Sequence, residues 1–119
     1  MENGHVTIET ILAMDDAHRT TVTVKEWKDA KVDVCSMTAT ERSDIEKRWA
    51  NKRASGDPAG FRRDILERSL KKPDGSPLGT SEQITALMQK NARAVEQLFE
   101  AACEVSGLTK KDVEELEKN

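Results

Sequence analysis

The 119-residue sequence contains 34% charged and 36% hydrophobic residues, with only four aromatic side chains. These values fit a single domain spanning residues 1–119 with a modest core, and two cysteines, Cys35 and Cys103, exclude a disulfide-rich scaffold. Because the sequence has neither a signal peptide nor an apolar run long enough to cross a membrane, we expect a cytoplasmic protein.

The net charge of −3 is unevenly distributed. Residues 41–72 carry ten basic and six acidic side chains and therefore +4, whereas residues 1–40 carry −3 and residues 73–119 carry −4. A basic middle segment can suit nucleic acid. Its acidic residues, however, are interleaved at helical spacing, with Glu67 and Lys71 as one such pair, which is typical of a solvated helix surface.

The chain first predicts a short amphipathic helix. Ile8, Ile11 and Leu12 have the spacing of one helical face, and Thr7 before them can act as the N-cap. Residues 15–18 then form a polar connector.

A β-hairpin is expected next. Residues 21–24 and 31–34 alternate β-branched apolar with polar side chains, the period of half-buried strands. The loop between them, residues 25–30, contains Trp27. Because a two-stranded hairpin is only marginally stable alone, we expect one of its faces to pack on helices.

Capping signals mark the helices that follow. Thr38 and Glu41 form a capping box, and the helix that they start should fade near residues 53–55. Asp57-Pro58 starts another helix, which cannot continue beyond Pro73.

After a turn rich in proline and glycine, three more helices are predicted. Thr80 and Asn91 are N-caps, and Gly107 supplies a left-handed stop before a short final helix that opens at Thr109. The helix after Asn91 has the strongest apolar stripe, formed by Val95, Leu98, Phe99 and Ala102. Together the elements predict an α+β fold, a mostly helical single domain with a short N-terminal β-hairpin packed on the helices.

The sequence lacks the groups that catalysis requires. Asp15, Asp16 and His18 form one small cluster of metal-ligating side chains, but no further ligand completes a coordination shell, so we expect a polar loop. Phosphate-binding glycine loops and hydrolase or protease motifs are absent from the sequence. We therefore expect a protein that is not an enzyme, without catalytic, metal-binding or cofactor-binding residues.

Several short motifs occur in an informative order between residues 7 and 119. They are Val22-Thr23-Val24, Glu26-Trp27, Val32-Asp33-Val34, Thr38-Ala39-Thr40-Glu41-Arg42, Asp74-Gly75-Ser76-Pro77-Leu78, Leu98-Phe99-Glu100-Ala101-Ala102, Ser106-Gly107-Leu108 and Val113-Glu114-Glu115-Leu116-Glu117-Lys118-Asn119. This order resembles the tail assembly chaperone family of long-tailed, siphovirus-type bacteriophages and prophages. Relatives often have glycine after the tryptophan, where this chain has Lys28-Asp29, so the hairpin loop is expected to differ.

The resemblance implies a role in viral tail morphogenesis without catalysis. Such a chaperone binds the tape measure protein non-covalently, keeps this long and partly hydrophobic protein soluble, and helps tail tube assembly in the cytoplasm of the bacterial host, without entering the mature virion. A binder of this kind needs apolar surface framed by charge. The candidates are apolar residues outside the strong stripes, with ordinary packing as the alternative for each: Trp27, Leu78, Leu108, Val113 and Leu116.

Two further expectations remain open at this point. Many such phages append a domain that recruits tail tube protein through a −1 frameshift. Both Glu117-Lys118-Asn119 and Thr109-Lys110-Lys111 are compatible with slippery codons. The alternative function is a small phage-encoded regulator that binds nucleic acid through residues 41–72, with a steep salt dependence. Self-association is left open.

Overall fold

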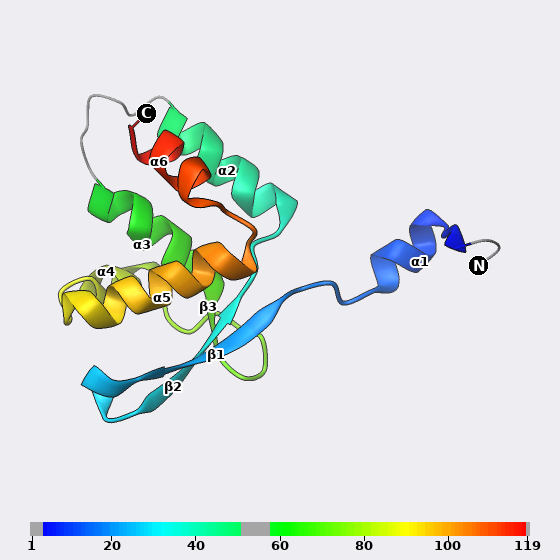
Figure 1. The fold of residues 1–119 in the computed structure, drawn as a ribbon. Coiled ribbons are helices and arrows are strands. Elements are labelled where there is room, and N and C mark those ends of the chain that lie inside the picture. Colours follow the sequence, from blue (N-terminus) through cyan, green and yellow to red (C-terminus); the bar gives the residue numbers. More distant parts are fainter. Residues whose placement is uncertain (1–3, 51–57, 119) are drawn as a thin grey trace.

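The computed structural model describes residues 4–50 and 58–118. The chain forms helix α1 (Ile8–Ala13), strand β1 (Arg19–Val24), a 3-10 turn η2 (Lys25–Trp27), strand β2 (Ala30–Cys35), helices α2 (Ala39–Ala50) and α3 (Pro58–Ser69), strand β3 (Leu70–Lys71), and helices α4 (Ser81–Leu87), α5 (Ala92–Val105) and α6 (Lys110–Lys118). The predicted α+β class is confirmed, with the hairpin packed against helices (Figure 1).

The sheet is antiparallel in the order β1-β2-β3. Val22 pairs with Val32 across the predicted hairpin, and Val34 pairs with Leu70 of β3. The sequence predicted only the hairpin. The third strand exists because α3 ends at Ser69 and Pro73 forbids a helix, so the two residues after α3 satisfy their backbone groups on β2.

Helix α5 lies at the centre of the fold. It packs on α3 on one side and on β1 and β2 on the other (Figure 1). The predicted stripe is buried, and Phe61 of α3 makes edge-to-face contacts with Phe99 and Trp49, at ring-centroid distances of 6.1 and 5.9 Å. A single core thus joins the sheet to the helices.

The predicted helix boundaries follow from local hydrogen bonds. The Glu41 amide donates to the Thr38 hydroxyl at 3.1 Å, and Thr80 forms the same kind of box with Gln83. At the end of α5, Gly107 has a φ of 72°, and the Leu108 amide donates to the Cys103 carbonyl at 2.9 Å, the pattern of a Schellman end. Pro58 begins α3 as expected, whereas Asp57 and the predicted end of α2 near residues 53–55 lie outside the described residues.

The hairpin loop keeps a demanding conformation. Lys28 and Asp29 have φ angles of 57° and 59°, in the left-handed region that glycine adopts most easily. The loop therefore adopts a left-handed backbone without glycine, and the side chains of Lys28 and Asp29 strain it.

Candidate partner-binding site

The largest concentration of exposed apolar side chains lies on a projecting segment at the N-terminus, residues 6–14, which we call the arm. Its apolar side chains are between 38% and 77% exposed: Val6, Ile8, Ile11, Leu12 and Met14. None of the residues of α1 is buried. Figure 1 shows α1 standing apart from the other elements, joined to β1 only by the connector that was predicted at residues 15–18.

The arm owes its helix to a local cap. The Thr10 amide donates to the Thr7 hydroxyl at 3.3 Å, as the sequence predicted. Six helical residues are far too few to be stable in isolation. A short helix that presents an uncovered stripe of Ile8, Ile11 and Leu12 is therefore typical of an element that is completed by a partner.

The sequence predicted this helix but did not mark its residues as partner-binding. The available signal was the stripe of Ile8, Ile11 and Leu12 itself. Periodicity shows which face of a helix is apolar, but it does not show whether that face meets the core or solvent.

Two of the residues that the sequence did name lie together in a hollow between α5 and α6. The hollow has a volume of about 490 Å³ and includes Phe99, Leu108 and Val113 in its lining. Leu108 is buried in the core, whereas Val113 is partly buried and packs against it. Leu116 belongs to α6, but its side chain lies outside the described part of the chain.

The other two named residues do not line this hollow. Trp27 follows β1 in η2 and packs, partly buried, against the core. Leu78 is 38% exposed in the turn before α4, where its amide donates to the Leu70 carbonyl at 3.0 Å. The five named residues therefore do not form one continuous surface, and their role in binding remains a prediction.

Several arginines of the basic segment are engaged in contacts within the fold. Asp64 is 3% exposed and accepts hydrogen bonds from Arg48 at 3.1 Å, from the Trp49 indole at 3.0 Å and from Arg63 at 2.7 Å. The charge-assisted bonds from Arg48 and Trp49 fasten α2 to α3. Arginines in such contacts are less available to phosphate groups.

Two more arginines of α3 are held in the same way. Arg62 donates to Glu96 of α5 at 3.0 Å, and its guanidinium lies 4.8 Å from the centre of the Phe99 ring. Arg68 donates to the Asp64 carbonyl at 2.8 Å. Lys52 and Arg53 fall outside the described residues.

Two carboxyl groups with a lowered pKa lie in a turn and at a helix N-terminus. The Ser76 hydroxyl and amide lower the pKa of Asp74, and the Thr109 amide, helped by the Thr109 hydroxyl, lowers the pKa of Asp112.

Within residues 4–50 and 58–118, no three His, Cys, Asp or Glu side chains gather as a metal site would require. In the same residues, no helix has the length and hydropathy needed to cross a membrane.

Comparison with known proteins reveals a structural likeness. No family model matches the sequence, and no curated protein matches it significantly. Among solved structures, the tail assembly chaperone of bacteriophage HK97 has a similar fold, with a TM-score of 0.59 over 87% of this chain and 96% of that chain, at 13% sequence identity. The resemblance seen in the sequence motifs is thereby confirmed at the level of the fold.

Proposed function

We propose that this protein is a phage tail assembly chaperone that binds the tape measure protein non-covalently, keeps it soluble and helps tail tube assembly. The observation that carries the proposal is the fold, which resembles the HK97 tail assembly chaperone over nearly the whole of both chains. The sequence motifs point to the same family independently. The exposed apolar arm adds what such a chaperone needs, a surface suited to another hydrophobic protein.

The arm would bind by packing its stripe against apolar residues of a helical partner. Burying one aliphatic side chain fully contributes about 1.5–3 kcal/mol, whereas association costs roughly 4–15 kcal/mol. Three side chains, Ile8, Ile11 and Leu12, therefore give weak binding for a single copy. A long partner that offers many such sites would retain many copies, each of them easily displaced when the tube forms.

The test is co-expression of the tagged protein with the tape measure protein of the same phage. The double variant Ile8→Ser, Leu12→Ser removes the two most exposed side chains of the stripe, and Glu9→Gln, Thr10→Ser changes the polar side of the same helix as a matched control. We expect the parent and the control to keep the tape measure protein in the soluble fraction and the stripe variant to lose it. Equal solubility with the stripe variant would overturn the role of the arm.

The partner-binding residues predicted from the sequence are tested in the same assay. Trp27→Ser, Leu78→Ser and the pair Val113→Ser, Leu116→Ser test the hairpin loop, the turn and α6 in turn. Leu108 is only 7% exposed, so its substitution would unfold the end of α5 and is not informative. Each variant counts only if its circular dichroism spectrum matches that of the parent.

The same proposal includes a site of action in the bacterial cytoplasm, absence from the mature virion and a tail tube partner recruited by a frameshifted extension. Reading the codons for Thr109-Lys110-Lys111 and Glu117-Lys118-Asn119 tests the frameshift, since it requires a slippery run at one of these places. Mass spectrometry of purified virions tests the absence.

The rival, a nucleic-acid-binding regulator, is supported less well. Of its basic residues, Arg48, Arg62, Arg63 and Arg68 are engaged with acidic or carbonyl groups of the fold. Binding to DNA or RNA at low salt that weakens steeply as salt is added would favour this rival over the chaperone.

A further inference from the structure

Strand β1 is an open edge of the sheet. The Ser36 amide donates to the His18 carbonyl at 2.8 Å, which identifies His18 and Ser36 as a hydrogen-bonded pair of the ladder. Because such pairs alternate along antiparallel strands, Thr20 and Val22 also bond to β2. The backbone groups of the residues between them therefore point away from the sheet: Arg19, Thr21 and Thr23.

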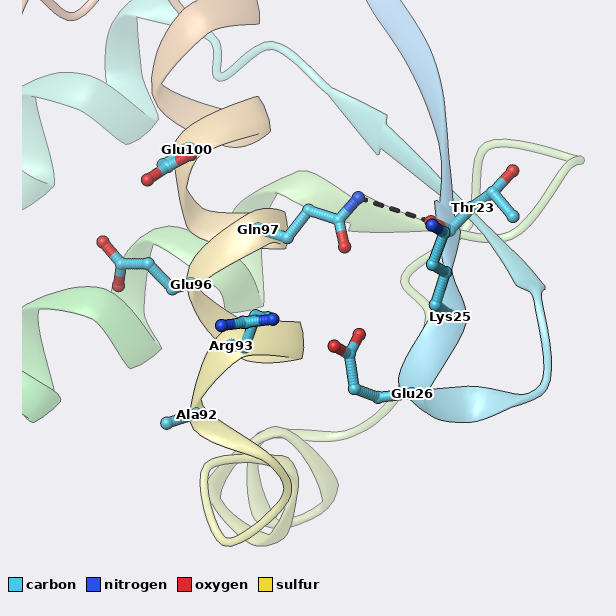
Figure 2. A pocket seen from close by; sticks show the side chains of 8 residues that line it. All are labelled: Thr23, Lys25, Glu26, Ala92, Arg93, Glu96, Gln97 and Glu100. Atoms are coloured by element: carbon cyan, nitrogen blue, oxygen red, sulfur yellow. Dashed lines mark hydrogen bonds between the residues drawn. The ribbon is translucent and has the colours of Figure 1, made fainter.

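Little covers this edge. Within residues 4–50 and 58–118, one side chain bonds to its outward groups: the Gln97 amide of α5 donates to the Thr23 carbonyl at 3.3 Å (Figure 2). The stretch from Arg19 to Thr21 stays open. Proteins usually protect such an edge with proline, a bulge or charged side chains. The β1 sequence, RTTVTV, has no proline, and its one charged residue is Arg19 at the start of the strand.

A groove runs beside this edge, between β1 and α5. Three adjoining hollows form it, with volumes of about 720, 540 and 480 Å³ from the hairpin end to the arm end. Neighbouring hollows share lining residues: Thr23, Gln97 and Glu100 between the first two, and Glu104 and Val105 between the last two. Figure 2 shows the first hollow, with Gln97 reaching across it.

The two walls run alongside each other in opposite directions. His18 lies by Gly107 at one end, and Lys25 lies by Ala92 at the other. A chain laid in the groove would therefore follow β1 and α5 together over their whole length.

The middle of the groove is acidic. Its charged lining residues are Glu100 and Glu104, which are exposed on α5 and also line the hollow between α5 and α6. No ion pair to either is found among the described residues. One helical turn apart, they are separated by about 6 Å along the axis. Alternate residues of a β-strand are separated by about 6.7 Å and point to the same face. The rim therefore matches basic side chains at positions i and i+2 of an added strand.

We propose that an extended basic segment of a partner protein adds to β1 as a further strand of the sheet, with its basic side chains on Glu100 and Glu104. Backbone bonds to the open edge would give the affinity, and the acidic rim would select the sequence. A second copy of this chain suits the site less well, because its β1 offers a single basic residue, Arg19. This surface is separate from the arm, so the inference goes beyond the proposed function and does not depend on it.

The test uses synthetic eight-residue peptides with the full-length protein. One peptide alternates valine and lysine, a second alternates valine and glutamate, and a third repeats the lysine peptide with alternate amide nitrogens methylated. Methylation keeps the charge but removes the donors on one edge of the peptide. NMR amide shifts locate the bound peptide, and hydrogen exchange measures the protection of the Thr21 amide.

We expect the lysine peptide to bind, to shift the amides of β1 and to slow the exchange of the Thr21 amide at least tenfold. The glutamate and methylated peptides should do neither. Glu100→Gln, Glu104→Gln should weaken the lysine peptide roughly tenfold, whereas Glu82→Gln, Glu115→Gln, on exposed positions of α4 and α6, should leave it unchanged.

Three results would overturn the inference. Equal binding of the methylated peptide would show simple charge attraction without strand addition. Shifts confined to residues outside β1 would place the basic site elsewhere. Protection of Thr21 that rises with protein concentration alone would show that a second copy occupies the edge.

Discussion

The backbone of the hairpin loop is strained at two residues, Lys28 and Asp29. Both residues hold φ near 60°, after the 3-10 turn that carries Trp27. A residue with a side chain is strained there by about 1–2 kcal/mol. The sequence shows lysine and aspartate at these positions. It does not show their left-handed conformation, because that depends on the two strands that the loop must join.

This strain gives a prediction for Lys28. Lys28→Gly should raise the free energy of unfolding by about 0.5 kcal/mol, since relief of strain exceeds the extra entropy that glycine loses on folding. Urea denaturation measures the change. As a control, Lys72→Gly replaces an exposed lysine that does not have positive φ and should lower stability. If both glycines destabilise equally, the left-handed angle at Lys28 carries no strain.

At the scale of elements, the sequence predicted what depends on neighbours in the chain. Thr38 with Glu41 and Thr80 with Gln83 form their boxes because the partners are three residues apart. Strand β3 was missed because its pairing with β2 joins residues far apart in sequence, and the two residues from Leu70 to Lys71 carry no period of their own.

Whether the apolar face of a helix is buried also depends on contacts between residues far apart in sequence. Val95 and Phe99 were predicted to be buried and are buried, because their stripe is long enough to need the core. Ile8 and Leu12 have the same spacing but are exposed. The i, i+3, i+4 spacing occurs in both helices and differs only in how far it continues, so the packing is needed to separate the core from the candidate site.

The N-terminus of α6 gives a prediction for pH. Asp112 accepts a hydrogen bond from the Thr109 amide at 3.0 Å, and this bond lowers the pKa of Asp112 below its ordinary value of 3.8. Because the pKa is lowered, the cap stabilises α6 fully at pH values above the ordinary pKa of 3.8. This stabilisation is lost as the pH falls through the lowered pKa. Amide exchange in α6 should therefore accelerate in acid beyond the intrinsic dependence.

Asp112→Asn is the control for this cap. It keeps an oxygen that can accept the Thr109 amide bond but removes the ionisable group, so the additional acid sensitivity of α6 should disappear. The N-terminus of α4, capped by Thr80 and Gln83 without a carboxylate, should show no such step in either protein. An acid step that persists in Asp112→Asn would assign it to another group.

At the scale of the whole molecule, the arm enlarges an otherwise compact body. The radius of gyration is 15.8 Å, whereas a compact domain of this length is expected near 13.5 Å. The excess fits Figure 1, in which α1 lies beyond the rest of the fold. The molecule thus divides into a packed body and an element that adds surface without adding core.

This division predicts that the arm can be removed without loss of the fold. Deletion of residues 1–13 should change the free energy of unfolding by less than about 0.5 kcal/mol, because no residue of α1 is buried. The same deletion should reduce the radius of gyration measured by small-angle X-ray scattering towards 13.5 Å. Under the proposed function, it should also abolish the solubilisation of the tape measure protein.

The size and stability measurements together separate two states of the arm. If the parent protein already scatters like a compact domain and deletion lowers its stability by several kcal/mol, the arm folds back onto the body in solution, and its apolar residues belong to the core. If the size falls and the stability is unchanged, the arm projects, and Ile8, Ile11 and Leu12 are available to a partner before it arrives.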